Sequence, residues 1–226
     1  MSHTHAHAPH ELTEPHGHRA PPDRMERLLE LGAVLLLSLT TVATAWSGYQ
    51  AARWSGEQSQ HYARASAIRI QAQQQSTLAG QLRIGDLNLF DGWLDARVSG
   101  NEKLAAVYRR RFRAAFVPAF DAWLAQHPLS RTAAIPGPQY QPEYRLQEDA
   151  RAAALNARAD DLYREGTEAK TNDDRYILST VFFAAVLFFA GISLRLDWRP
   201  LRMAVLGLAG AMLLGGLVFV ATLPIA

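Results

Sequence analysis

The sequence predicts an all-α membrane protein with three transmembrane helices and an extramembrane helical domain built on extensions of the first and second spans. Three long blocks of the chain are apolar and nearly free of charge, and the region after the first block is rich in Ala, Gln and Arg, which are good helix formers. The composition, 49% apolar and 19% charged, excludes a collagen-like or wholly disordered chain. Because there is no cysteine, a disulfide scaffold, thiol catalysis and iron–sulfur clusters are excluded as well.

Each apolar block is long enough to cross a bilayer as a helix. A helix rises about 1.5 Å per residue, so about 20 residues cross a hydrocarbon core of about 30 Å. We therefore expect transmembrane helices over residues 28–50, 176–194 and 203–224. The first block has one alternative, a cleaved signal peptide, because Ala43-Thr44-Ala45 resembles a cleavage site. We favour an uncut helix, since cleavage after residue 45 is late for such a segment and the flank before the block is not clearly basic.

The loop between the second and third spans determines the expected orientation. Short loops rich in Lys and Arg stay in the cytoplasm, and this one carries three arginines and one aspartate. The topology-determining residues are Arg195, Arg199 and Arg202. The N-terminus is then cytoplasmic as well, and residues 51–175 and the C-terminus are extracytoplasmic. The inverted topology remains the alternative.

Residues 1–24 are predicted to form a disordered, His-rich tail, because four prolines interrupt them and they show no apolar period. Closely spaced imidazoles can bind Zn, Ni or Cu, although ordering such a tail costs entropy and makes the binding weak. The candidate ligands are His3, His5, His7, His10, His16 and His18. The other interpretation is a soluble tail of biased composition. We expect no other cofactor, since His61 and His127 have no partner at ligand spacing in the sequence.

The extracytoplasmic region, 51–175, is expected to be helical with one interruption. The stretch from 51 to 98 lacks proline, so the first span should continue outward without a break. Ser99-Gly100-Asn101 is a turn in which Asn101 can cap the next helix. That helix, expected over 102–126 and kinked or divided by Pro118, carries an apolar stripe at every fourth residue. The stripe comprises Leu104, Tyr108, Phe112, Phe116 and Phe120.

A Pro-rich loop is expected over 127–142, with helix resuming at Glu143 and running into the second span. The arginines at 109, 110, 111 and 113 fall mostly off the apolar stripe and form either a solvated face or a patch for anionic head groups or an acidic partner. Nucleic acid is not an expected partner. Asp91 and Asp95 share a helix face near Asp86, and the nearby Arg83 and Arg97 favour ion pairing there over catalysis.

The third span carries small residues at every fourth position, Gly207, Ala211 and Gly215. Small residues at this spacing let helices approach closely, so the stripe predicts helix packing within the chain or between chains. The spans lack charges in mid-membrane, which ion-coupled transporters usually need. We find no phosphate-binding glycine loop, metalloprotease motif or nucleophile elbow, and adjacent acidic pairs such as Asp160 and Asp161 diverge on a helix. An enzyme is therefore not expected.

Three segments carry a resemblance to known proteins: WSGYQAARWSGEQSQHYARA, STLAGQLRIGDLNLFDGWLDA and RRRFRAAFVPAFDAWL. They resemble small bacterial multi-pass inner-membrane proteins with a domain of unknown function, over most of residues 25–200. The resemblance rests on general texture and implies one early span, an outer helical region and two closing spans in a bacterial inner membrane. It carries over no active residues. Lysine occurs only at positions 103 and 170, and this preference for Arg over Lys fits a GC-rich genome.

The sequence thus favours a non-enzymatic integral membrane protein that presents a helical outer domain for self-association or for binding a partner in the cell envelope. We expect contact with the lipid bilayer and a homo-oligomer. Two alternatives stay open: a small channel or transport-associated subunit, with the Gln- and Ser-rich helix lining a vestibule, and a metal-responsive membrane protein that uses the His-rich tail.

Overall fold

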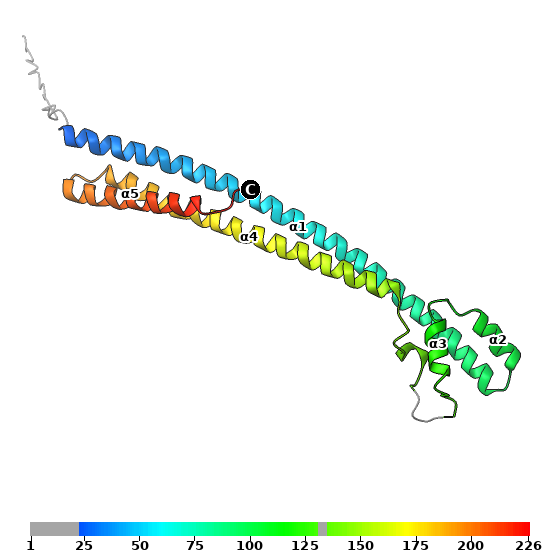
Figure 1. The fold of residues 1–226 in the computed structure, drawn as a ribbon. Helices are drawn as coiled ribbons and strands as arrows, with labels where there is room; N and C mark the ends of the chain where they lie inside the picture. The colour runs from blue at the N-terminus through cyan, green and yellow to red at the C-terminus, as the bar shows by residue number, and fades with distance from the viewer. Residues whose placement is uncertain (1–22, 131–134) are drawn as a thin grey trace, which may run out of the picture. The chain divides into compact units, whose positions relative to one another are not determined.

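The computed structural model describes residues 23–130 and 135–226. These residues form helices and no strand, which confirms the all-α class. The elements are α1 (Arg24–Val98), α2 (Glu102–Arg110), α3 (Val117–Leu124), the 3₁₀ helix η1 (Pro138–Tyr140), α4 (Gln147–Ser193) and α5 (Arg199–Ala221) (Figure 1). Helices α1, α4 and α5 each contain a stretch that is long and apolar enough to cross a membrane.

The described chain divides into two compact units. Unit 1 contains the described residues up to Tyr49 together with Tyr176–Leu223, and unit 2 contains Gln50–Arg175 with Pro224–Ala226. Helices α1 and α4 contribute to both units without interruption. The expectation that the first apolar block continues as an unbroken helix is confirmed by the 75 residues of α1. The physical reason is that none of these residues is a proline, which would interrupt the helix.

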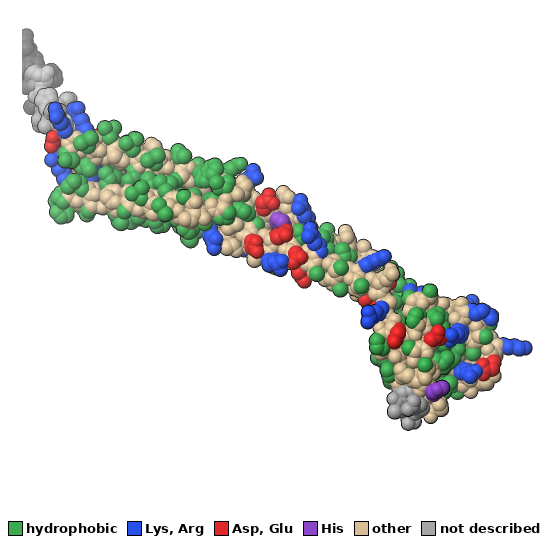
Figure 2. All heavy atoms as spheres, viewed as in Figure 1, with side chains coloured by type: hydrophobic (Ala, Val, Ile, Leu, Met, Phe, Trp, Pro, Cys, Tyr) green, Lys and Arg blue, Asp and Glu red, His purple; other side chains and the backbone are tan. Residues whose placement is uncertain are grey.

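Unit 1 packs α1, α4 and α5 around an apolar core. Phe183, Val186 and Ala190 of α4 are fully buried there against Ala209 and Leu213 of α5. Partly buried side chains of α1, among them Leu36, Leu37 and Ala43, complete the core. Hydrophobic side chains also predominate on the face of this unit that Figure 2 shows, as expected when the surrounding solvent is lipid.

One glycine determines how closely α4 and α5 pack. A Cβ atom added at Gly216 would lie 2.6 Å from Cε1 of Phe183, whose ring is fully buried and has no free space. At Gly215, the neighbouring position, a Cβ would meet nothing within 4 Å. Only the face of α5 that contains Gly216 therefore requires the absence of a side chain.

Unit 2 is built on an antiparallel pair formed by the later part of α1 and the earlier part of α4 (Figure 1). Small side chains are buried along the contact at every seventh residue: Ala65, Ala72 and Ala79 on α1, and Ala152, Ala159 and Gly166 on α4. This is the heptad spacing of a coiled coil. The same spacing continues along α4 through Leu162, Ala169, Tyr176, Phe183 and Ala190, all of them buried.

Close approach and ion pairs hold this helix pair in register. A Cβ at Gly166 would lie 2.6 Å from ring carbons of Tyr62, and that ring stacks on Tyr163 with centroids 5.0 Å apart. On the exposed edge, Arg69 donates to Asp160 over 3.0 Å and Arg83 donates to Asp149 over 2.7 Å. Exposed pairs of this kind add little stability, so the small-residue contact is the main determinant of the packing.

At the far end of the pair, α2 and α3 fold back on the end of α1 around a group of stacked rings that we call the tip cluster. It consists of Phe90, Trp93, Phe112, Phe116, Phe120 and Trp123, all buried. Most of the ring pairs within it adopt edge-to-face or tilted geometry, which suits the quadrupole of aromatic rings. The predicted apolar stripe therefore supplies much of a real core.

One expected division of a helix was found, and one expected helix start was wrong. The region 102–126 is not one helix, because the chain leaves helical structure after Arg110 and re-enters it at Val117, with Pro118 in the first turn of α3. Proline lacks an N–H and fits a helix best in its first turn. Of the two outcomes expected at Pro118, a kink or a division, the structure has the division. Consequently Leu104, expected inside, is 42% exposed. Helix α4 begins at Gln147 rather than Glu143, since the preceding residues make turns.

Candidate functional site

A buried carboxylate joins three parts of the tip in unit 2. Asp86 of α1 is 1% exposed and accepts hydrogen bonds from Nε and Nη2 of Arg113, at 2.9 and 2.7 Å, and from the Tyr144 hydroxyl at 2.9 Å. Arg113 lies between α2 and α3, and Tyr144 lies in the segment before α4. We call this group the Asp86 clasp. A charge buried this deeply requires such partners.

The environment of the clasp favours the protonated forms of its two donors, Tyr144 and Arg113. Burial, followed by the hydrogen bond to Asp86, raises the pKa of Tyr144 above its usual value near 10. The hydrogen bonds that Arg113 donates to Asp86 also raise the pKa of Arg113. The arginine is therefore always charged and the tyrosine always neutral at physiological pH. The three hydrogen bonds of the clasp hold the segments around Arg113 and Tyr144 on α1.

Also in the tip, residues of the end of α1 and of helices α2 and α3 line a depression of about 300 Å³ that we call the tip groove. Trp93, Ala105 and Leu124 supply apolar surface, and Ala106 lies beside them. Two ion pairs flank it, Arg97 with Glu102 and Arg109 with Asp121. An apolar depression bordered by fixed charges can accept an aliphatic or aromatic side chain and orient the polar groups around it.

The basic face expected on α2 is only partly free. Arg109 pairs with Asp121 over 2.7 Å and also lies 4.8 Å above the Phe120 ring, and Arg113 is occupied by the clasp. Arg110 and Arg111 are exposed and form no ion pair within residues 23–130 and 135–226. At the end of α2, Arg110 and Arg111 thus carry two exposed guanidinium groups that form no ion pair with a described residue.

A second depression, of about 470 Å³, lies at the opposite end of unit 2 and is lined by polar residues of α1 and α4. His61 lies between two carboxylates there: Nδ1 is 3.0 Å from Glu165, without the angle of a hydrogen bond, and Nε2 is 3.9 Å from Glu57. His61 therefore does have acidic neighbours, one of them from a distant part of the sequence. Among the described residues no group of three or more side chains is arranged to hold a metal ion.

The chain's last residues close this depression. The indole nitrogen of Trp54 donates to the carbonyl of Pro224 over 3.1 Å, and the amide of Ala226 donates to the buried side chain of Gln50 over 3.0 Å. The arrangement fixes the segment after α5 against α1. Of the side chains that line the depression, Trp54 is used in these contacts and His61 lies near Glu57 and Glu165, and we assign the depression no ligand.

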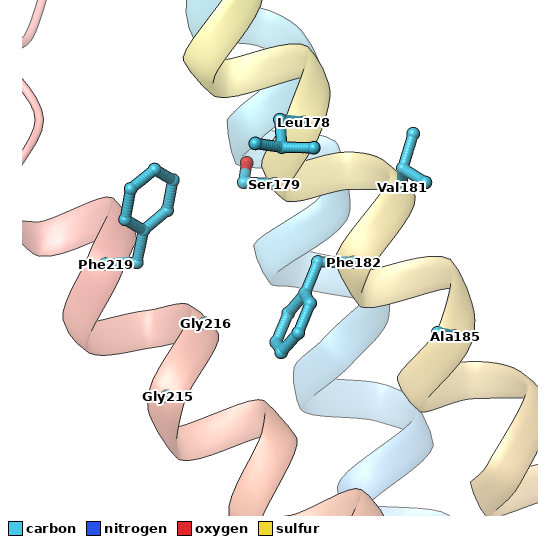
Figure 3. A pocket seen from close by; sticks show the side chains of 8 residues that line it. All are labelled: Leu178, Ser179, Val181, Phe182, Ala185, Gly215, Gly216 and Phe219. Atoms are coloured by element: carbon cyan, nitrogen blue, oxygen red, sulfur yellow. The ribbon is translucent and has the colours of Figure 1, made fainter.

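Unit 1 carries an apolar lateral groove of about 440 Å³ between α4 and α5. Figure 3 shows Phe182 and Phe219 on either side of a floor formed by Gly215 and Gly216. Its one polar side chain, Ser179, already donates to the carbonyl of Tyr176 at 2.7 Å. The groove therefore offers shape and apolar surface and no specific polar recognition.

The predicted site residues have mixed outcomes. The six tail histidines lie outside the described residues. Gly207, Ala211 and Gly215 are all exposed, and an added Cβ at either glycine meets nothing within 4 Å, so the stripe does not pack within the chain. The stripe remains a prediction for packing between chains. Arg195, Arg199 and Arg202 lie around the turn between α4 and α5, and of the three only Arg202 is buried.

Two features were missed by the sequence analysis. Asp86 forms an ion pair as expected, but with Arg113, while Arg83 and Arg97 pair with Asp149 and Glu102. The seven-residue recurrence of small residues in α1 and α4 was a signal in the sequence that indicates helix pairing. The Asp86 clasp had no such local signal, because its members are far apart in the chain.

Comparison of the chain with models of protein families, with curated proteins and with solved structures found no match. The functional argument therefore rests on the chain's own residues.

Proposed function

We propose that this chain is a non-enzymatic inner-membrane protein of a bacterium that presents unit 2 outside the cytoplasm, where the tip groove binds a protein partner of the cell envelope. The observation that carries the proposal is the groove itself, with Trp93 and Leu124 as apolar surface between two ion pairs. Interfaces commonly take one anchoring side chain into such a depression, with polar groups around it.

Three properties of the described residues support this assignment. The three apolar helices are compatible with an integral membrane protein. The Asp86 clasp and the tip cluster make the groove's walls rigid, which reduces the entropy lost on binding. The groove borders are already paired, so a partner gains affinity mainly from apolar burial.

The alternative of a channel or transport subunit is less well supported. Phe183, Val186 and Leu213 fill the core of unit 1, so the described helices of one chain have a largely apolar interior. Its buried hydroxyls, such as those of Thr40 and Ser193, donate to carbonyls of their own helices. A pore would therefore have to form between copies of the chain. The feature that supports self-association is the exposed small-residue stripe of α5, which lets helices of two copies approach closely.

Site-specific photo-crosslinking in intact cells tests the partner. A photoreactive residue at Ala106, in the groove, should give an adduct with another protein, whereas one at the exposed Ala153 on α4 should not. A charge at the groove, introduced as Leu124→Glu, should remove the adduct at Ala106. Equal adducts at both positions, or an adduct that survives Leu124→Glu, would contradict the proposal.

The orientation has its own test, which the absence of cysteine makes simple. A single cysteine at exposed Ala153 should react with an impermeant maleimide in intact cells, and one at exposed Asp197 should react only after the cells are opened. The reverse pattern would place unit 2 in the cytoplasm and refute the envelope partner.

A further inference from the structure

The strongest unexplained group in the molecule is Arg202, in the first turns of α5. It is 7% exposed, yet neither Nε nor Nη2 has a hydrogen-bond partner among residues 23–130 and 135–226. A guanidinium remains charged at all physiological pH values, and leaving it buried without an acceptor costs far more than leaving a neutral group so. The free energy of the fold therefore favours an acceptor supplied from outside the described residues.

The described carboxylates of unit 1 do not supply that acceptor. Asp23, just before α1, pairs with Arg199 at 3.6 Å, and none of Glu26, Glu30 and Asp197 forms an ion pair with Arg202. In contrast to Arg113, which Asp86 neutralises in unit 2, Arg202 has no partner among the described residues.

The start of α5 provides further donors at the same place. Trp198 is the N-cap, and no side chain caps the helix there. Because Pro200 has no N–H and the Arg202 N–H donates to the Trp198 carbonyl, the donors that this start offers are the N–H groups of Arg199 and Leu201. The first backbone N–H groups of a helix point outward and carry a partial positive charge, which makes an uncapped start suited to an anion. Because side chains tilt toward the N-terminus of their helix, the guanidinium of Arg202 is directed to this same end.

The position of the site selects the class of anion. The uncharged stretch of α5 starts at Met203, immediately after Arg202, and Trp198 is 67% exposed beside it, as is typical of an aromatic residue at head-group depth. A phosphate is the acceptor that matches a guanidinium fork and an uncapped helix together. At this depth the phosphates are those of membrane lipids, and anionic lipids are drawn to basic segments.

We propose that the start of α5 and the side chain of Arg202 form a binding site for the phosphate of an anionic membrane lipid. One lipid occupies the site in each chain, with its phosphate accepting from the Arg202 side chain and from the N–H groups of Arg199 and Leu201. The proposal requires unit 1 to lie in a bilayer, but it is independent of the partner proposed for the tip groove.

Native mass spectrometry of the full chain, delipidated in detergent and titrated with phosphatidylglycerol, tests the site. The decisive comparison is between Arg202→Gln and Arg195→Gln, each of which removes one positive charge. Arg202 is buried at the start of α5, whereas Arg195 is exposed in the turn between α4 and α5. We expect one bound lipid per chain, about ten- to hundredfold weaker binding for Arg202→Gln, and less than about twofold change for Arg195→Gln. Arg202→Lys, which keeps the charge and loses the fork, should be intermediate.

The other arms of the experiment identify the source of the phosphate. Phosphatidylcholine should bind more weakly than phosphatidylglycerol, and millimolar inorganic phosphate alone should neither bind nor stabilise the chain. Stabilisation by inorganic phosphate without a preference for the anionic lipid would assign the site to a soluble anion and overturn the proposal. Equal losses in Arg202→Gln and Arg195→Gln, with both variants folded by circular dichroism, would show only general attraction to a negative surface and overturn it as well.

Discussion

The Asp86 clasp makes a quantitative prediction about the stability of the tip. Replacing Asp86 by Asn keeps the size of the side chain and removes its charge. The carboxylate accepts three hydrogen bonds, two from Arg113 and one from Tyr144. An amide has one oxygen, so its N–H₂ group must face a donor, and at least one of the three bonds is lost.

The expected cost follows from these contacts. A hydrogen bond to a charged group contributes about 1.5–3 kcal/mol, and breaking a buried ion pair costs about 3–5 kcal/mol. Asp86 is almost completely buried, but the side chain of Arg113 is 32% exposed and can regain water as a partner. We therefore expect Asp86→Asn to lower the free energy of opening of the tip by about 2–4 kcal/mol.

Hydrogen–deuterium exchange with mass spectrometry measures this opening locally, without unfolding unit 1. Peptides that contain Trp93 or Trp123, both in the tip cluster, should exchange about 30- to 1000-fold faster in Asp86→Asn. Asp91→Asn is the matched control, because Asp91 is exposed on the same helix, and it should change the free energy by less than about 0.5 kcal/mol. Equal exchange in the two variants would refute the view that the clasp holds the tip together.

Three further predictions concern packing and pH. Gly166→Ala should lower the melting temperature, at a cost of about 1–3 kcal/mol because its Cβ meets a stacked ring, whereas Gly56→Ala, with open space around it, should raise the temperature slightly. In unit 1, Gly216→Ala should reduce stability in detergent and Gly215→Ala should not; equal effects would contradict the close packing of α4 and α5. Because the folded pKa of Tyr144 lies above its usual value, the stability it contributes is complete below about pH 10 and is lost as the pH rises from there toward the folded pKa. Denaturant unfolding of Tyr144→Phe should thus show a smaller loss of stability above about pH 10 than the native chain, and parallel curves would contradict it.

The sequence predicted the helical class, the three apolar helices and the unbroken course of α1, because each depends on local composition and on spacing along one helix. The boundaries in the tip were less predictable. Tyr144 was expected within a helix that starts at Glu143, but its hydroxyl binds Asp86, 58 residues away, and the segment forms turns instead. A contact of this separation leaves no periodic signal in the sequence.

The same distinction applies to the small residues. The glycines of α5 are visible in the sequence as a stripe, but the stripe does not indicate which of them a neighbouring helix approaches. The rotation of α5 about its axis is determined by packing against Phe183, so Gly216 is buried while Gly207 and Gly215 are exposed. Likewise, the arginines of the turn before α5 are equivalent as charges in the sequence. Local composition by itself determined that this protein has three apolar helices and a helical outer region, whereas only the tertiary structure decided which glycine admits a ring and that Arg202 is buried without an acceptor, because both depend on what a distant helix places beside them.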